Sequence, residues 1–349
     1  DIFIVIGGPH VSALPQRTLR ECPDIDVAII GEGEYVLKEF FDLLQSKGLC
    51  SEMADIRGII FRHDDKIIGY PDSVYIEDLN LLPLPARHLF DMSKYMKYSY
   101  YTGAKNHPVA SIVTSRGCPH SCLFCSRSNS GHRFRPRSPE NVISELEQLK
   151  GYGFKEVQIV DDDFTAERNR VFEICKLIKE KKIDMTFCLL GGVRVDSVDE
   201  ELLSAMYDVG FYSIYFGVES GDDAVLKAVR KGITVKQIRK AVQTAKKIGY
   251  NVTLYVIAGL PGSTVESEKK TLQLTKELGV IARVSVCTPY PGSPLWSMYE
   301  DSLQGISWER YNESDIIHSI HLPSCLTNEK LQVWMNEVKG SSRLDKKIF

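Results

Sequence analysis

The chain has 349 residues, of which 43% are hydrophobic and 26% are charged, the balance of an ordinary globular protein. A formal net charge of -3 gives no reason to expect nucleic acid or an anionic membrane as the main partner. The longest apolar runs, such as residues 2–6 and 27–30, have the length of strands, so we expect no membrane span.

The first 50 residues alternate between strand-like and helix-like segments. Residues 2–6 and 26–30 are continuous apolar runs, typical of strands covered on both faces, and a helix is predicted after Glu34. Two β/α units cannot close a sheet alone, so we expect the C-terminal part of a doubly wound, Rossmann-like domain. Because the chain opens on Asp1 inside an apparent strand, without a signal peptide, we expect it to be N-terminally truncated.

A hairpin and a linker are predicted next. Residues 58–70 read as two strands that turn at Asp64, and two prolines mark a linker that starts at Asp78. The predicted division is 1–77 for the Rossmann-like part with the hairpin, 78–107 for the linker, 108–295 for a barrel and 296–349 for a C-terminal extension.

From residue 108 the pattern becomes a regular alternation of strands and helices. The strands are predicted at 109–115, 156–161, 185–190, 212–218, 252–258 and 283–287. Helical periodicity is clearest over residues 171–178, and capping patterns predict helix starts at Ser197, Thr234 and Ser263. Repeated β/α units predict a parallel sheet with right-handed crossovers. Since eight units close a full barrel, the fold class expected is α/β with an open, partial (β/α)6 barrel.

Three cysteines follow the first barrel strand in the spacing C-x3-C-x2-C, at Cys118, Cys122 and Cys125. Thiolates are the usual ligands of iron–sulfur clusters, and a tight loop can wrap three of them around one cubane. Three protein ligands leave one iron open to a further ligand. Two alternatives remain from the residues alone, namely buried structural cysteines or a zinc site completed by His120 or His132.

The other cysteines are scattered along the chain, and the total of nine is odd. This distribution favours a reducing compartment with one metal site over a secreted disulfide framework. We therefore expect the protein to be cytoplasmic.

With Phe124 before its last cysteine, the loop resembles the most specific motif of the radical S-adenosylmethionine (SAM) superfamily, and the resemblance covers roughly residues 108–295. It implies a [4Fe-4S] cluster on Cys118, Cys122 and Cys125, with the methionyl amino and carboxylate groups of SAM on the open iron. Reductive cleavage of the sulfonium C–S bond then yields a 5'-deoxyadenosyl radical, which abstracts hydrogen from a substrate.

The resemblance also implies SAM contacts at the carboxyl ends of the strands, where barrel enzymes gather their functional groups. The implied residues are Phe124, Asp162, Asp163, Arg194, Glu219, Ser220, Ile257 and Gly259. The residues alone leave ordinary alternatives open: a solvated loop or helix cap for the acids, a surface cation for Arg194 and a cap for Glu219. The basic stretch 132–137 is either a solvated loop or a site for a substrate anion.

Glycine-rich turns follow the two N-terminal strands and resemble the end of the cobalamin (B12)-binding domain found in one subgroup of the superfamily, over roughly residues 1–45. The implied contacts are Gly7, Gly8, His10, Gly31, Glu32 and Gly33. Residues 289–294 resemble a segment of the same type of enzyme. A generic Rossmann-like remnant, with His10 an ordinary loop histidine, is the alternative. Whether this chain by itself binds cobalamin is left open.

The resemblance thus implies a radical SAM enzyme, with cobalamin-dependent methyl transfer to an unactivated substrate atom as the first choice. The alternatives are a radical cyclase or rearrangement enzyme of the anaerobic porphyrin-ester cyclase type and a non-catalytic, zinc-stabilised β/α protein. The expected partners are a small-molecule or lipid-like substrate and an electron donor such as flavodoxin or ferredoxin, with no nucleic acid.

Overall fold

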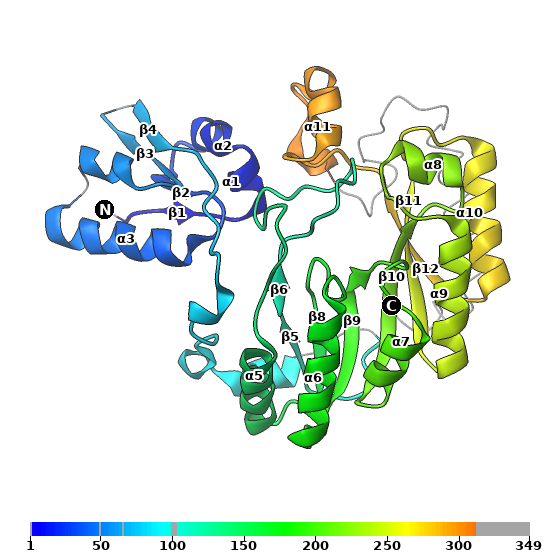
Figure 1. Cartoon of the computed structure of the whole chain (residues 1–349). Helices are drawn as coiled ribbons and strands as arrows, with labels where there is room; N and C mark the ends of the chain where they lie inside the picture. Colours follow the sequence, from blue (N-terminus) through cyan, green and yellow to red (C-terminus); the bar gives the residue numbers. More distant parts are fainter. Residues whose placement is uncertain (1, 49, 65, 99–102, 312–349) are drawn as a thin grey trace. The chain divides into compact units, whose positions relative to one another are not determined.

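The computed structural model describes residues 2–48, 50–64, 66–98 and 103–311 (Figure 1). The chain divides into two compact units, and each is described by itself. The N-terminal unit joins residues up to 77 with two later segments, 117–133 and 289–306, whereas the barrel unit holds most of the chain from 78 to 288. Most of the predicted C-terminal extension lies outside the described residues.

The N-terminal unit contains one four-stranded sheet in the order β1-β2-β3-β4. Its strands are β1 (Val5–Ile6), β2 (Val27–Ile29), β3 (Ile59–His63) and β4 (Lys66–Tyr70). The first two strands are parallel, and the predicted hairpin is confirmed as antiparallel β3 and β4. The hairpin also pairs with β2, so it extends the Rossmann-like sheet, which the sequence did not predict.

Helices cover both faces of this sheet, and alternate residues of β2 separate the two layers. Val27 and Ile29 pack with Phe40 of α3, while Ala28 packs with Leu19 of α2. The helical segments are α1 (Pro9–Ala13), α2 (Pro15–Glu21), α3 (Gly33–Lys47), η1 (Ser51–Asp55), α11 (Pro294–Tyr299) and η4 (Glu300–Leu303). The expectation of a buried strand over residues 2–6 is wrong in part. β1 is at the edge of the sheet, and Ile2 is 90% exposed.

The barrel unit contains six parallel strands in the order β12-β11-β10-β9-β8-β5, which confirms the predicted fold class. They are β5 (Val109–Ile112), β8 (Glu156–Ile159), β9 (Thr186–Val193), β10 (Phe211–Glu219), β11 (Asn251–Ala258) and β12 (Ile281–Val286). Over the described residues, β5 and β12 each pair on one side only, so this sheet is an open barrel. A short ribbon pairs β6 (Ser115–Arg116) with β7 (Arg135–Pro136).

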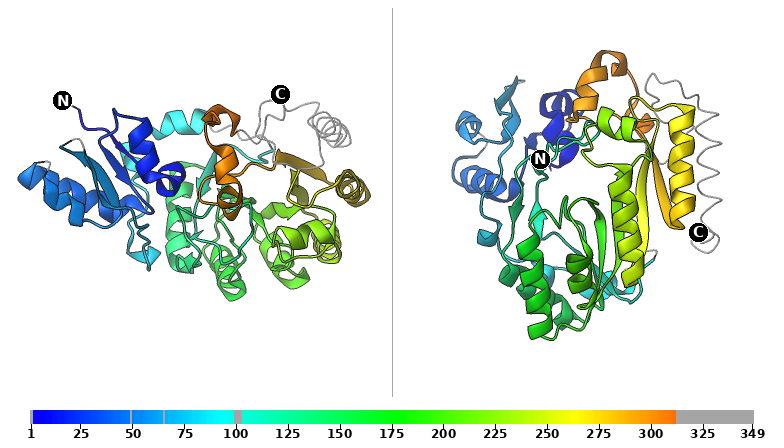
Figure 2. Two further views of the ribbon diagram at one scale, coloured as in Figure 1. Left: turned by 90° about the horizontal axis from the view of Figure 1, so that it is seen from above. Right: turned by 45° about the vertical axis from the view of Figure 1, so that its right-hand side comes forward.

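The order of the strands follows the chain, and right-handed crossovers then place the helices on one face of the sheet (Figures 1 and 2). The helices are α5 (Pro139–Tyr152), α6 (Arg168–Glu180), α7 (Glu200–Tyr207), α8 (Asp223–Ala228), α9 (Val235–Ile248) and α10 (Val265–Leu278). Shorter segments are η2 (Leu79–Leu81), η3 (Arg87–Leu89), α4 (Met92–Tyr98) and η5 (Trp308–Arg310).

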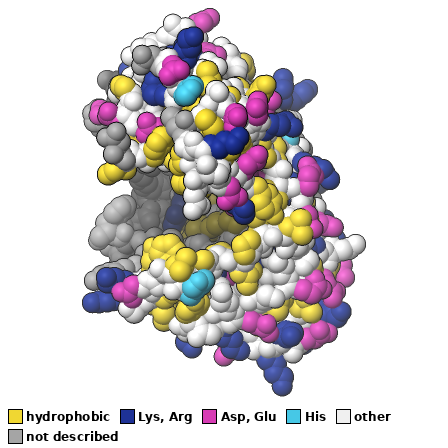
Figure 3. Space-filling model, turned by 90° about the vertical axis from the view of Figure 1, so that its left-hand side faces the viewer, with side chains coloured by type: hydrophobic (Ala, Val, Ile, Leu, Met, Phe, Trp, Pro, Cys, Tyr) yellow, Lys and Arg dark blue, Asp and Glu magenta, His cyan; other side chains and the backbone are white. Residues whose placement is uncertain are grey.

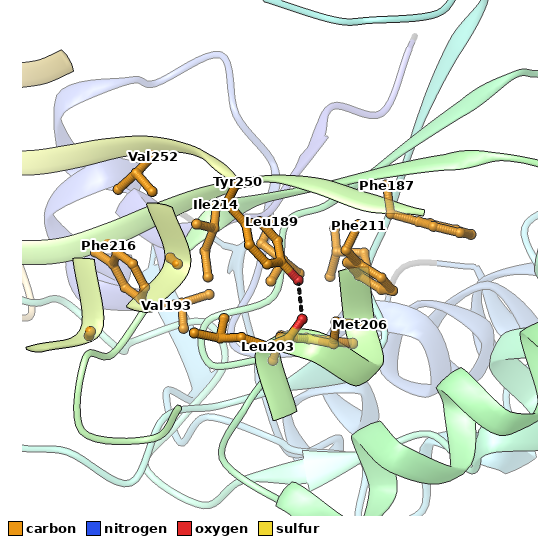
Figure 4. Packing of buried hydrophobic residues seen from close by; sticks show 14 of the residues in the cluster. Phe187, Leu189, Val193, Leu203, Met206, Phe211, Ile214, Phe216, Tyr250 and Val252 are labelled. Atoms are coloured by element: carbon orange, nitrogen blue, oxygen red, sulfur yellow. Dashed lines mark hydrogen bonds between the residues drawn. The ribbon is translucent and has the colours of Figure 1, made fainter. Parts of the chain in front are cut away.

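The main hydrophobic core lies between this sheet and its helices (Figure 4). Phe187 and Phe211 stack with ring centroids 4.8 Å apart, and burial of each such ring contributes about 2–3 kcal/mol. The phenol of Tyr250 donates to the carbonyl of Leu203 at 2.8 Å, so this polar atom is satisfied inside the core. The core therefore fixes the sheet whose carboxyl ends carry the predicted site.

The capping residues in the structure can be compared with the three helix starts predicted from the sequence. Thr234 caps α9 with a complete capping box, as predicted. The other two starts are wrong by one or two residues, because Asp199 caps α7 and Thr264 caps α10. Ser197 instead donates to the carbonyl of Arg194. Where several short polar residues precede a helix, the tertiary fold selects among them.

No described helix combines the length and the apolar character that a membrane crossing requires. On the face drawn in Figure 3, acidic and basic side chains are intermixed rather than gathered into areas of one sign. This agrees with the small net charge of the chain.

Candidate functional site

The loop with the three cysteines belongs to the N-terminal unit. Cys122 is 5% exposed, and Cys118 and Cys125 are half-buried. The amide of Cys125 donates to the carbonyl of Cys122 at 3.3 Å, which closes a tight turn between these two residues. Gly117 begins the loop at φ 82, where a Cβ atom would stand 2.2 Å from the Arg133 carbonyl oxygen, so only glycine fits there.

The segment 289–294 and the start of α11 hold this loop. The amide of Leu295 donates to the carbonyl of Leu123 at 2.9 Å, and Ser126 Oγ donates to the carbonyl of Pro291 at 2.7 Å. Ser128 Oγ reaches the carbonyl of Pro9 at the start of α1, at 3.1 Å. The loop is thus tied to segments distant in sequence, and the spacing of the cysteines gave no sign of this.

The donor set of the loop suits an iron–sulfur cluster. Three cysteines lie within eight residues on a tight turn that is partly open to solvent. By contrast, burial raises the pKa of Cys175 to about 12, of Cys188 to about 11 and of Cys287 to about 12. These three stay protonated thiols at neutral pH, whereas ligation of iron needs thiolates.

The barrel unit carries the predicted residues at the ends of β8, β9 and β10. After β8, Asp161 is buried and accepts from Thr114 N at 2.6 Å and from Ser115 Oγ at 2.6 Å. Asp162 is exposed, while Asp163 is 1% exposed. Burial raises the pKa of Asp163 to about 6, against the opposing effect of the nearby Arg194 charge. Of the two buried carboxylates in the acidic run, Asp163 is the one that feels the charges of Arg194 and Lys231 beyond the next strands.

Arg194, after β9, is neither a surface cation nor an open fork. It is 8% exposed, and its Nε and Nη2 atoms donate to the two carboxylate oxygens of Asp196 at 2.9 and 2.8 Å. Its Nη1 atom donates to the carbonyl of Lys231 at 2.9 Å. The bidentate face of the guanidinium is therefore occupied within the chain.

Glu219 ends β10 in a strained conformation and forms a buried ion pair. Its φ is 64, in the left-handed region that non-glycine residues rarely adopt, and the strand register shifts just before it. Lys231 Nζ lies 2.7 Å from Glu219 Oε1, and both side chains are less than one tenth exposed. A Cβ at Gly217 would lie 3.1 Å from the ammonium, so glycine leaves room for the pair. The sequence carried no signal for Lys231.

Among the other predicted SAM contacts, Ser220 and Gly259 form hydrogen bonds within the chain, whereas Ile257 and Phe124 are half-buried. Ser220 Oγ accepts from the amide of Asp222 at 3.2 Å and is buried, an internal role. Gly259 has φ 74, and its amide donates to Glu268 at 3.0 Å. Burial raises the pKa of Glu268, which holds the loop after β11. Sequence reasoning missed it because an acid in the first turn of a helix, here α10, is ordinary. Ile257 and, in the cysteine loop, Phe124 are half-buried.

The glycine turns of the N-terminal unit differ from one another. A Cβ at Gly8 would meet nothing within 4 Å, and Gly7 and His10 are exposed. At Gly31 a Cβ would stand 2.5 Å from the carbonyl oxygen of Val74. In the same turn, Glu32 accepts from the Ile76 amide at 2.7 Å.

The contacts seen at Gly31 and Glu32 are thus internal, and the Cβ of Gly33 would stand 3.2 Å from Ile29. Of these turn glycines, Gly8 alone has open space where a Cβ would stand, since a Cβ at Gly7 would lie 3.6 Å from the Ile29 carbonyl oxygen.

The basic stretch 132–137 is not a solvated loop throughout. Arg133 pairs with Glu77, and Arg137 pairs with the buried Glu145 of α5. Arg135 is 3% exposed. Arg133 and Arg137 therefore each form an ion pair with a carboxylate of the same chain.

Residues 112–275 match the model of the radical SAM superfamily. The chain is 38% identical over 263 residues to an uncharacterised methyltransferase of Pyrococcus horikoshii, a match that covers 75% of this chain and 55% of the relative. The chain therefore belongs to the radical SAM superfamily, a class of enzymes.

Two further relatives show the breadth of reactions in the group. A cytidylyl-2-hydroxyethylphosphonate methyltransferase of Streptomyces wedmorensis is 28% identical, with 75% of this chain and 53% of the relative covered. An anaerobic magnesium-protoporphyrin IX monomethyl ester cyclase of Rubrivivax gelatinosus is also 28% identical, with 74% and 46% covered. The chain spans about half the length of these curated relatives.

Solved structures share the fold. The methyltransferase TsrM from Kitasatospora setae, solved with cobalamin and a [4Fe-4S] cluster, has a TM-score of 0.69 at 18% identity, covering 95% of this chain and 64% of its own. OxsB, solved with aqua-cobalamin and SAM, has a TM-score of 0.64 at 19% identity, covering 99% and 49%.

Proposed function

We propose that the chain is the catalytic part of a radical SAM methyltransferase, with a [4Fe-4S] cluster on Cys118, Cys122 and Cys125. The observation that carries the proposal is the three-cysteine turn, held in place by hydrogen bonds from distant segments, in a chain of this superfamily. When bound, the cluster supplies the electron that cleaves SAM and starts radical chemistry.

The barrel unit contributes the groups that bind and orient SAM. Asp163 is ionised above about pH 6 and accepts hydrogen bonds from the cofactor's ammonium. Glu219 and Lys231 offer a carboxylate and a cation at the end of β10, so each can exchange its partner for a group of the cofactor. The backbone from Ile257 to Gly259 would hold the adenine, because the left-handed glycine at 259 carries no side chain that could obstruct a planar ring. Asp162 and Ser220 have lesser roles, because the first is exposed and the second is used internally.

Methyl transfer is favoured over cyclisation because the most similar of the relatives named above is called a methyltransferase. The cyclase relatives keep the ring-forming reaction as the second candidate. Membership in an enzyme superfamily argues against a non-catalytic zinc protein.

We infer that the whole protein uses cobalamin, since the fold is shared with two proteins solved with it. In this chain the turn at Gly7, Gly8 and His10 is the part proposed to approach the corrin, because a Cβ at Gly8 would meet nothing within 4 Å and Gly7 and His10 are exposed. The turn after β2, with Gly31, Glu32 and Gly33, makes internal contacts, and no reaction step is assigned to it. The substrate is a small or lipid-like molecule, and flavodoxin or ferredoxin is the expected type of electron donor.

The first experiment tests the cluster. Anaerobic reconstitution of the chain should give about four irons and four sulfides per chain, and dithionite with SAM should yield 5'-deoxyadenosine. Cys122→Ala should lose both, whereas Cys22→Ala, at an exposed cysteine outside the loop, should keep both. Zinc without sulfide in the wild-type chain would refute the proposal.

The second experiment separates the two reactions. SAM labelled in its methyl group is supplied to the full-length protein with cobalamin and candidate substrates, and the product is analysed by mass spectrometry. Label in the product supports methyl transfer. A ring-closed product without label would establish the cyclase instead.

A further inference from the structure

The six-stranded sheet of the barrel unit has two chemically different faces. Side chains alternate along a strand, and those that face the helices are apolar members of the main core. Residues at the alternate positions on the other face are largely polar: Gln158, Cys188, Ser213, Tyr215, Thr253, Tyr255 and Arg283. A parallel sheet covered on both faces reads as a continuous apolar run, so this face is built for a different purpose than packing.

Three side chains in the middle of this face form a fixed group. The rings of Tyr215 and Tyr255 have centroids 5.4 Å apart at 34°, and the Arg283 guanidinium lies 5.3 Å from the Tyr215 ring centroid. Tyr255 donates to the carbonyl of Leu190 at 2.9 Å, and its ring comes within 3.8 Å of where a Cβ at Gly192 would stand. Tyr215 is 7% exposed. The aromatic pair is therefore held before any ligand arrives.

Arg283 is a cation of this face without a described carboxylate beside it. It is exposed, and in the described part of the chain no carboxylate lies within 4.0 Å of it. The nearby acids are engaged elsewhere, since Glu219 pairs with Lys231 and Glu156 accepts from the Tyr212 phenol at 2.8 Å. Burial raises the pKa of Tyr255 to about 12, so its phenol adds no negative charge at neutral pH.

We propose that Tyr215, Tyr255 and Arg283 select the substrate, and that this substrate is a small molecule with a planar or apolar body and an anionic group. The half-buried ring of Tyr255 offers surface for the body, the buried Tyr215 supports that ring and the Arg283 guanidinium from behind, and the planar guanidinium matches a carboxylate or a phosphoryl group. This inference rests on the proposed function, because it narrows the substrate class of that same enzyme.

The test compares two probes of equal shape, naphthalene-2-carboxylate and naphthalene-2-carboxamide. Their dissociation constants are measured by ligand-observed NMR on the purified chain, without SAM or reductant. The carboxylate should bind about fivefold more tightly than the amide, the factor expected from one partly exposed ion pair. Arg283→Gln should abolish this preference, and Arg283→Lys should keep part of it.

Arg239→Gln is the matched control, because Arg239 is on α9 and already pairs with Glu277. This variant should keep the preference, and circular dichroism confirms that all variants fold. Equal affinity for the two probes, no binding of either at about 1 mM, or a preference that survives in Arg283→Gln would overturn the inference.

The outcome does not depend on the radical reaction, since neither cofactor nor reductant is present. Formation of 5'-deoxyadenosine without any probe preference would overturn this inference and leave the proposed function standing. A preference that requires Arg283, in a chain that never forms 5'-deoxyadenosine, would support the anion site and refute the proposed function.

Discussion

Three successive aspartates after β8 have three different environments, which shows how strongly position governs a residue's chemistry. Asp161 is tied by hydrogen bonds to Thr114 and Ser115, Asp162 is exposed, and Asp163 is buried with a raised pKa. Arg194, the residue after β9, pairs with Asp196, and Glu219, the last residue of β10, pairs with Lys231. Neighbouring residues of one type therefore differ in burial, in hydrogen bonding and in the groups that they can bind.

The buried pair of Glu219 and Lys231 gives the first prediction. Lys231→Met leaves a buried carboxylate without its cation, so we expect the free energy of unfolding to fall by about 3 kcal/mol. Adding Glu219→Gln removes the stranded charge and should recover part of the loss. Urea denaturation of the two single variants and the double variant measures the coupling. Simple additivity of the two losses would show that the pair does not interact as described.

Asp163 gives a prediction about pH. Its folded-state pKa of about 6 lies above the ordinary 3.8, because burial disfavours the charged form. The fold therefore binds this proton more tightly than the unfolded chain does. The resulting stability is complete below the ordinary pKa and is lost as the pH rises through about 6.

In the Asp163→Asn variant the amide cannot ionise, so the variant does not lose stability as the pH rises through about 6. Relative to the wild type, the variant should gain up to about 3 kcal/mol of unfolding free energy between about pH 4 and pH 8. Urea denaturation of both proteins across this range measures the difference. A difference that is constant with pH, or that falls as pH rises, would contradict the assignment.

At the scale of elements, turns with similar glycines have different physical reasons. The turn after β1 places Gly8 at φ 108 with open space around it, while the turn after β2 places Gly31 at φ 80 against the backbone of Val74. The second turn joins β2 to the segment that follows the hairpin, through the bridge between Gly31 and Val74. Sequence alone could not distinguish these turns, because the distinguishing neighbour lies 43 residues along the chain.

This contrast predicts the effect of two alanines. Gly8→Ala adds only backbone strain and should cost about 1 kcal/mol. Gly31→Ala adds a clash with Val74 to the same strain and should cost about 3 kcal/mol or more. Thermal and urea unfolding of each variant are compared with the wild type. Equal costs at the two positions would show that the contact with Val74 is not important.

At the scale of the whole molecule, the cysteine loop, α1 and residues 289–306 belong to one unit, although they are far apart in the chain. The hydrogen bonds of Leu123 and Ser126 to the segment 291–295 couple this segment to the loop. Loss of a cluster from the loop should therefore loosen both segments, while the core strands of the barrel unit keep their own packing.

Hydrogen exchange after iron removal checks this coupling. Chelation of iron from the reconstituted chain should speed exchange in residues 117–133 and 289–306, because their protecting hydrogen bonds open more often. Exchange in β11 (Asn251–Ala258), within the barrel core, should change little and provides the internal control. Faster exchange confined to 117–133 would contradict the coupling.

The sequence by itself determined the order of strands and helices, the open parallel barrel and the three-cysteine loop. The signals that predict these features are local, because apolar periodicity reports which face of a segment is buried and ligand spacing reports which donors share a loop. Even the cap at Thr234 followed from residues within one turn.

Only the tertiary structure decided the remaining features. It joined the hairpin to β2, locked Arg194 onto Asp196 and brought Lys231 to Glu219 and Glu268 to Gly259. It also placed Arg283 on the polar face of the sheet, beside the Tyr215 ring and without a described carboxylate partner. Each of these pairings depends on which strand ends and loops meet in space, and electrostatic and steric contacts of that kind leave no periodic trace in the sequence.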